Sequence, residues 1–150
     1  MLKFLPMLAL ALTMPLAVLA DDDDEEESAG ALAGMLAREN RETLPALTLA
    51  SGVPLAEGPM RLRSGGYYNL PIEADGSAEL QIVGPEFFRA IWINEVVIND
   101  IEIRPLGLDS IEFDDEGELR MSFIAIKPGS YAIYIPGTTG ETQRVEIIIE

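Results

Sequence analysis

The chain has neither cysteine nor histidine among its 150 residues. Without cysteine it can form no disulfide, no thiolate metal site and no thiol nucleophile. Without histidine it lacks the commonest metal ligand and general base, so Ser110 and Ser122 have no such partner to activate them. A carboxylate pair such as Glu112 with Asp114 is easily found in any chain this acidic. We therefore expect a protein that is not an enzyme.

Basic residues are also scarce, with 10 Lys and Arg against 26 Asp and Glu and a formal net charge of −16. A field of this sign repels nucleic acids and anionic membrane surfaces. Hard metal cations and basic or exported proteins are the expected partners, and nucleic acid is not.

The first twenty residues are typical of a secretory signal peptide. Lys3 precedes an apolar run over residues 4–19, and the small residue Ala20 comes directly before an acidic block. An uncleaved membrane anchor is the alternative, but two prolines and a threonine interrupt a run that is short for the roughly 20 residues of a span. We expect a periplasmic or secreted protein with no membrane insertion after cleavage.

The next segment, DDDDEEES at 21–28, offers nothing apolar to bury and is expected to be a solvated acidic tail that improves solubility or weakly gathers cations. Residues 29–44 have helical spacing of leucine and methionine and are compatible with a short helix before Pro45. Residues 46–59 suggest a linker that docks loosely or pairs as a first edge strand. The expected organisation is a signal peptide at 1–20, acidic tail and linker at 21–58, and one domain at 59–150.

Within that domain apolar residues alternate with polar ones, which predicts strands with one buried face. The pattern covers 68–72, 80–82, 101–103, 111–113, 119–125, 131–135 and 145–149, and turn signals such as ADGS, DDEG, KPGS and PGTTG separate its segments. Residues 85–100 are expected to form a loop or short helix that leads into a strand. Met121 falls on an apolar face and is expected in the core. Seven or so short strands of this kind indicate an all-β sandwich.

The order ELQIVG, an aromatic-rich crossing segment, IEIRP, the hairpin IEFDDEGELRMSFIAI, KPGSYAIYIPG and RVEIIIE resembles the cupredoxin-like domains of exported bacterial proteins over about residues 60–150. The resemblance implies a Greek-key β-sandwich. It places Ile135 about where the family has its copper-binding cysteine and residues 137–140 in place of the histidine-bearing loop. Type 1 copper needs a thiolate and imidazoles, so no type 1 copper is expected here.

Carboxylates are the remaining metal-binding chemistry, and they suit calcium or a lanthanide, which prefer oxygen ligands. The candidate ligands are Glu95, Asp100, Glu102, Asp109, Glu112 and Asp114. Asp100 and Glu102 share a strand face, about 7 Å apart between their Cα atoms. Asp114, Asp115 and Gly117 also suit a β-hairpin turn with no metal, and this is the favoured interpretation of these residues. The spacing does not match the twelve-residue calcium loop.

Aromatic residues gather in GGYYNL and EFFRAIWIN, which supply the candidate partner-binding residues Tyr67, Phe87, Phe88, Arg89 and Trp92. Alternation puts Tyr68 in the core and Tyr67 outward. Aromatic side chains with an arginine are typical interface anchors, and packing at one end of the sandwich is the alternative.

Two functions follow from these features. One is a non-enzymatic periplasmic binding or carrier protein that presents carboxylates to a hard cation. The other is a metal-free accessory protein that docks onto an exported or membrane complex through the aromatic patch.

Overall fold

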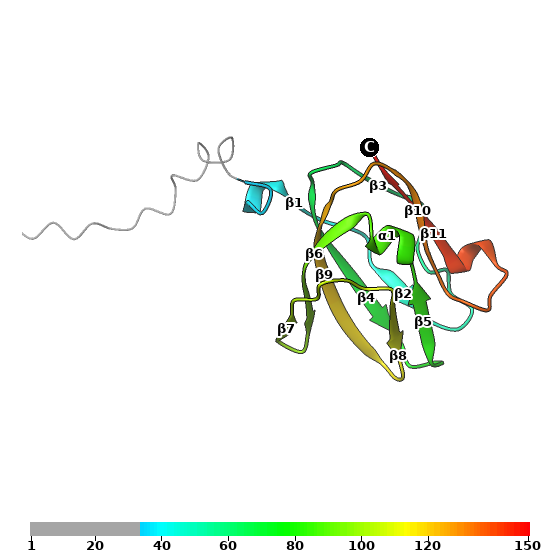
Figure 1. Ribbon diagram of the computed structural model, residues 1–150. Helices are drawn as coiled ribbons and strands as arrows, with labels where there is room; N and C mark the ends of the chain where they lie inside the picture. Colours follow the sequence, from blue (N-terminus) through cyan, green and yellow to red (C-terminus); the bar gives the residue numbers. More distant parts are fainter. Residues whose placement is uncertain (1–33) are drawn as a thin grey trace, which may run out of the picture.

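A computed structural model describes residues 34–150 (Figure 1), so the expected signal peptide, the acidic segment and the first part of 29–44 lie outside the described residues. In order, the elements are η1 (Arg38–Asn40), β1 (Arg41–Thr43), β2 (Leu47–Leu49), β3 (Met60–Leu62), β4 (Tyr67–Ala74), β5 (Leu80–Val83), α1 (Pro85–Phe88), β6 (Ile91–Ile98), β7 (Ile101–Ile103), β8 (Ser110–Phe113), β9 (Gly117–Ala125), β10 (Gly129–Tyr134), η2 (Glu141–Gln143) and β11 (Arg144–Ile149). Within 34–150, no helix is both long enough and apolar enough to cross a membrane.

The strands form two mixed sheets, which confirms the all-β expectation. In sheet A the order is β1-β4-β9-β6-β7, and β2 pairs with β4 as well. In sheet B the order is β3-β11-β10-β5-β8. The short helix α1 lies between β6 of sheet A and β10 of sheet B and contacts both (Figure 1). The expected short helix leading into a strand at 85–100 is confirmed as α1 followed by β6.

The DDEG segment does not close a hairpin, contrary to the sequence-based expectation. Strand β8 before it pairs with β5 in sheet B, whereas β9 after it pairs with β4 and β6 in sheet A. The chain therefore crosses from one layer to the other at residues 114–116. A hairpin and a crossover both preserve the period of two, which is why local alternation cannot distinguish them.

The inward faces of the two sheets make one core. The alternating positions Tyr68, Leu70 and Ile72 of β4 are buried there, and Met121 is fully buried as expected. Phe87 from α1 packs edge-on against Phe123 of β9, with ring centroids 5.6 Å apart. Such T-shaped pairs add to the stabilisation that burial already provides.

The sandwich includes residues before position 59. Strands β1 and β2 both run parallel to β4, in register with its first and last residues. Leu47, Leu49 and Leu55 are buried in the common core. Burial of these apolar side chains stabilises the packing of this segment on the sandwich. The second of the two expectations for 46–59, an edge strand, matches β2. Of the helix considered for 29–44, the described part contains only the single 3-10 turn of η1.

Strand β7 lies at the edge of sheet A and forms a hairpin with β6. Its turn residues Asn99 and Asp100 have φ angles of 47° and 66°, the left-handed pair that a two-residue hairpin turn requires. Ile101 and Ile103 alternate as expected but remain exposed, by 63% and 46%, in an edge strand all of whose residues are exposed. The one-sided burial expected for this strand is therefore wrong.

Candidate docking surface on the outer face of sheet A

Four residues form a row across the outer face of sheet A. Arg41 of β1 lies opposite Tyr67 of β4, Tyr67 opposite Ile124 of β9, and Ile124 opposite Trp92 of β6. Directly opposed residues in neighbouring strands project from the same face. Trp92 is 48% exposed, while Ile124 is buried. The row therefore sets an exposed indole beside a packed surface.

Tyr67 points to the outer face as alternation predicts, yet its side chain is only 1% exposed. The guanidinium of Arg41 lies 4.5 Å from the centroid of the Tyr67 ring and covers it. The expectation that Tyr67 is available as an exposed anchor is therefore wrong. Stacking of an arginine on an aromatic face explains the burial.

The hydroxyl of Tyr67 is the centre of a polar network. It accepts hydrogen bonds from Arg41 Nη2 and from Asn94 Nδ2, each at 3.0 Å, and donates one to Ser122 Oγ at 3.3 Å. Asn94 Nδ2 also lies 3.2 Å from Ser122 Oγ. Across residues 34–150 every buried side-chain nitrogen or oxygen has a partner. A satisfied network of this kind fixes its side chains in one arrangement.

A β-bulge places Asn94 in this network. The register between β6 and β9 shifts between Ile93 and Glu95, so that Asn94 is the extra residue. Bulges commonly redirect a side chain. Nothing in the local sequence pattern predicted Arg41, Asn94 or Ser122 as site residues. Two successive polar residues inside IWINEVVI are the one sequence signal for the bulge.

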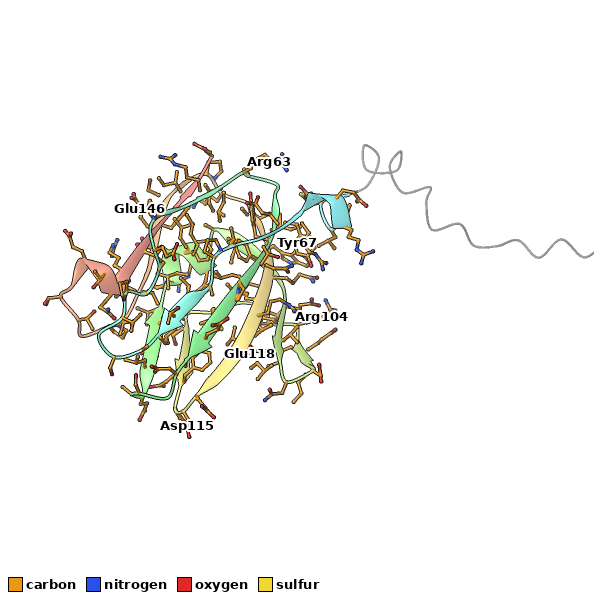
Figure 2. All side chains as sticks on the ribbon, turned by 180° about the vertical axis from the view of Figure 1, so that it is seen from behind. Arg63, Tyr67, Arg104, Asp115, Glu118 and Glu146 are labelled. Atoms are coloured by element: carbon orange, nitrogen blue, oxygen red, sulfur yellow. The ribbon has the colours of Figure 1, made fainter. Side chains whose placement is uncertain are left out.

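Arg104, directly after β7, ties two candidate metal ligands together. Arg104 is labelled in Figure 2. Its Nη2 atom lies 3.1 Å from Glu95 Oε2 and 3.1 Å from Glu102 Oε2, and its Nη1 contacts the Asn94 side chain at 3.2 Å. An arginine between two carboxylates supplies the positive charge that a bound cation would otherwise supply. Glu95 and Glu102 are therefore close together but already paired.

The other candidate ligands lie apart. Asp100 occupies the β6–β7 turn, Asp109 pairs with Arg89 at 3.0 Å, Glu112 faces Gln81 across sheet B, and Asp114 lies in the crossover loop. Among the residues that the structure describes, no group of three or more acidic side chains is placed to hold a metal ion. The structure thus does not assemble the six candidates into one site.

The predicted aromatic patch also divides. Phe87 and Phe88 are buried in the core, where their rings contact each other with centroids 5.7 Å apart. Arg89 and Trp92 are exposed. The alternative of sandwich packing is therefore correct for the two phenylalanines, and Trp92 is the aromatic member that can meet a partner.

We call this surface the Trp92 face, defined by Arg41, Tyr67, Trp92, Ser122 and Ile124. Arg120 shares the outward side of β9 with Ser122 and Ile124, since the three alternate along the strand. Its side chain is exposed.

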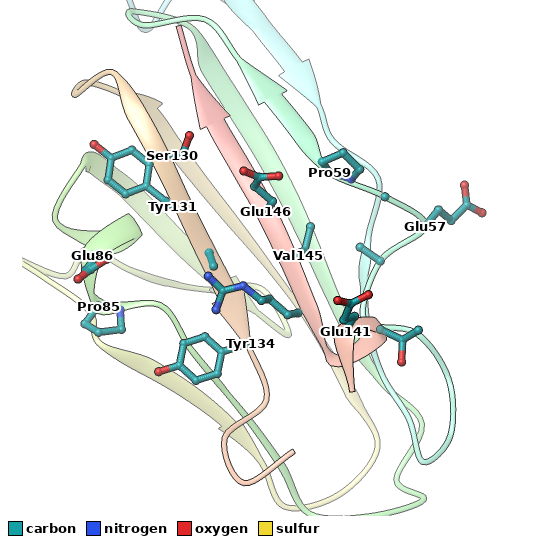
Figure 3. A pocket seen from close by; sticks show the side chains of 15 residues that line it. Glu57, Pro59, Pro85, Glu86, Ser130, Tyr131, Tyr134, Glu141, Val145 and Glu146 are labelled. Atoms are coloured by element: carbon teal, nitrogen blue, oxygen red, sulfur yellow. The ribbon is translucent and has the colours of Figure 1, made fainter. Parts of the chain in front are cut away.

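A second surface feature is an open groove of about 900 Å³ on sheet B (Figure 3). Its charged and aromatic lining residues include Glu57, Glu86, Glu141, Glu146, Tyr131, Tyr134 and Arg144. The Arg144 guanidinium lies 5.7 Å from the centroid of the Tyr134 ring. Four carboxylates around one arginine make the groove acidic, so it disfavours anionic ligands.

The positions that the resemblance assigned to copper ligands do not fit that metal. Ile135 is buried, its amide donates to the Gln143 carbonyl at 3.0 Å, and its carbonyl accepts from the Thr138 hydroxyl at 2.7 Å. These hydrogen bonds hold the start of the loop that follows β10. With neither thiolate nor imidazole in the sequence, the type 1 ligand set cannot be built from this chain.

Comparison with known proteins defines the fold. No protein-family model matches the chain, and no curated protein matches it. Solved structures do match. A multi-copper oxidase from Pseudomonas parafulva matches with a TM-score of 0.53 and 14% identity, over 75% of this chain and 31% of the oxidase. A multi-copper oxidase from Pseudomonas thermotolerans matches with a TM-score of 0.52 and 17% identity, over 75% of this chain and 30% of the oxidase. The chain therefore spans less than a third of the length of these oxidases. At such identities the likeness concerns architecture alone, and it shows that the fold is a cupredoxin-like β-sandwich.

Proposed function

We propose that this protein is a metal-free, non-enzymatic accessory protein of the periplasm that docks onto an exported or membrane complex through the Trp92 face. The observation that carries the proposal is a tryptophan, 48% exposed, fixed in register beside the buried Ile124 and Tyr67. Tryptophan and arginine are the residue types that most often dominate binding energy at protein interfaces.

The polar network beneath this surface supports the proposal. Tyr67, Asn94 and Ser122 hydrogen-bond to one another across three neighbouring strands. Side chains held by such bonds lose little conformational freedom when a partner arrives, which lowers the cost of association. The side chains of Tyr67, Asn94 and Ser122 are thus already held in place before a partner binds.

The ion pairs of the candidate carboxylates favour a docking function over the carriage of a cation. Arg104 neutralises Glu95 and Glu102, and Arg89 pairs with Asp109. A cation entering either place must displace an arginine from its hydrogen bonds. The location in the periplasm rests on the secretory signature of residues 1–20.

The test compares proteins captured from an extract of the producer's own periplasm. The wild-type chain, Trp92→Ala and Tyr134→Ala are immobilised separately, and captured proteins are identified by mass spectrometry. Tyr134 is the matched control, because it is a partly exposed aromatic on the opposite sheet. We expect one partner that the wild type and Tyr134→Ala retain and Trp92→Ala loses. The same partners on all three proteins would disprove docking through Trp92.

A further inference from the structure

The arginines nearest the start of the described chain lack acidic partners in spite of the acidic composition. Acidic side chains lie within 4.0 Å of Arg61, Arg89 and Arg104. Within residues 34–150 no such contact occurs for Arg38, Arg41, Arg63, Arg120, Lys127 or Arg144. The first three of these surround the entry of the chain into sheet A, and Arg120 lies on the outward side of β9.

Hydrogen bonds connect this arginine group to the Trp92 face. Arg63 Nη2 donates to Asn40 Oδ1 at 3.0 Å, and Asn40 directly precedes Arg41. Arg41 in turn binds the Tyr67 hydroxyl. From β1 to β6 the face is three strand spacings wide, about 14 Å. An acidic segment arriving along β1 meets these arginines and then Trp92.

The chain carries such a segment. Residues 21–27 are seven consecutive acids, and only six residues separate them from Gly34, the first of the described residues. A stretch of seven extended residues spans up to about 24 Å, more than the width of the face. Through so short a connection the segment is present at an effective concentration on the order of millimolar.

We propose that residues 21–27 dock onto Arg38, Arg41, Arg63 and Arg120 and cover the Trp92 face. The inference rests on the proposed function and extends it: the partner displaces this segment by offering acidic side chains of its own to the same arginines. Setting aside Lys3 and the seven acids leaves nine basic and 19 acidic residues in 34–150, a net charge of −10. A net acidic remainder repels the segment in general, whereas arginines without acidic partners attract it. Glu39 and Glu42 alternate with these arginines in the sequence, so the attraction depends on the guanidinium groups that have no carboxylate in contact.

Trp92 is the one tryptophan of the chain and reports on its own coverage. The experiment measures quenching of its fluorescence by neutral acrylamide, at low ionic strength, in the chain as recovered from the producing cell. The test variant replaces the seven acids by their amides, with asparagine at 21–24 and glutamine at 25–27. If the segment is docked at least half of the time, acrylamide quenches the variant at least about twofold more strongly than the wild type. Salt at about 0.5 M screens the contact and gives the wild type the same increase, with no change in the variant.

Arginine variants supply the matched control. Arg41→Gln is expected to increase quenching, whereas Arg144→Gln, an exposed arginine beside a tyrosine on the other sheet, leaves it unchanged. Equal quenching of wild type and amide variant at low salt overturns the inference. The proposed function fails separately, if captured partners do not depend on Trp92. An amide variant that captures the partner less well than the wild type would also contradict competition by the segment.

Discussion

The hydroxyl of Tyr67 lies 3.3 Å from Ser122 Oγ, and both side chains are only 1% exposed although they belong to the outer face of sheet A. Buried polar groups without partners are costly, so this bond and its neighbours hold the face in one conformation.

Removal of this hydroxyl is expected to destabilise the fold. Tyr67→Phe deprives Arg41 and Asn94 of an acceptor and should lower the free energy of unfolding by about 1–3 kcal/mol, as urea denaturation can measure. Tyr131→Phe is the control, because the Tyr131 hydroxyl donates to the Lys127 carbonyl at an exposed position. Equal losses in the two variants would show that the network adds nothing to stability.

Leu47 tests whether the sandwich includes the segment before residue 59. Leu47→Ala removes a fully buried side chain in β2 and should cost about 2–5 kcal/mol of unfolding free energy. Leu36→Ala, at an exposed leucine in the same region of the sequence, should change it by no more than about 0.5 kcal/mol. Thermal or urea unfolding measures both, and a negligible effect at Leu47 would mean that β2 is not part of the cooperative unit.

Asp100 is explained by its turn and not by a metal. Asp100→Gly relieves a left-handed backbone conformation and should leave stability unchanged or raise it by up to about 1 kcal/mol. Asn99→Ala puts a residue without a polar side chain at φ 47° and should lower it by about 1–2 kcal/mol. Urea midpoints measure the pair. A clear loss in Asp100→Gly would indicate that the carboxylate itself stabilises the native state.

The ion pairs of Arg104 should weaken cation binding. Calorimetric titration of the wild type with calcium or lanthanum should show no site tighter than about millimolar. Arg104→Gln frees Glu95 and Glu102 and should strengthen lanthanum binding, whereas Arg61→Gln, which frees Glu150 alone, should not. A micromolar site in the wild type would restore the carrier hypothesis.

Asp75 should contribute to stability in a pH-dependent way. Hydrogen bonding by Ser77 holds the pKa of Asp75 below the ordinary 3.8. The Ser77 side chain has the larger effect, and the Ser77 backbone amide, 2.9 Å from Asp75 Oδ1, has the next. Because the folded-state pKa is depressed, the contribution is present above pH 3.8 and is lost as the pH falls through the lower folded-state pKa.

The measurement compares urea midpoints of wild type and Asp75→Asn at neutral pH and near pH 3. The difference at neutral pH should shrink on acidification. Glu79→Gln is the control in the same loop, since the Glu79 carboxylate accepts no hydrogen bond within residues 34–150. A difference for Asp75→Asn that does not vary with pH would contradict a role for its ionised form.

Alternation in the sequence predicted the class of fold and much of the core. Tyr68, Leu70, Ile72 and Met121 are buried where the period of two placed them, and the resemblance to cupredoxin-like domains is confirmed as an architecture. The same alternation did not predict that β8 and β9 lie in different sheets. A strand shows which of its faces is apolar but not which strand it pairs with.

The candidate site could be predicted only in part. Aromatic composition singled out Trp92, but it could not separate the exposed indole from the buried Phe87 and Phe88, which have the same chemistry at neighbouring positions. Acidic composition suggested ligands, but not that Arg104 would meet two of them. Carboxylates are common in this chain, and their roles depend on which cation the fold brings within reach.

By itself, then, the sequence determined the chemistry available: no thiolate or imidazole, a large excess of carboxylates, and strands with one apolar face. Tertiary structure alone decided that Arg41 covers Tyr67, 26 positions away, and that Tyr67 bonds to Ser122, 55 positions away. The physical reason is that these contacts arise when distant strands pair, and strand pairing is set by the whole core and not by any local run of residues.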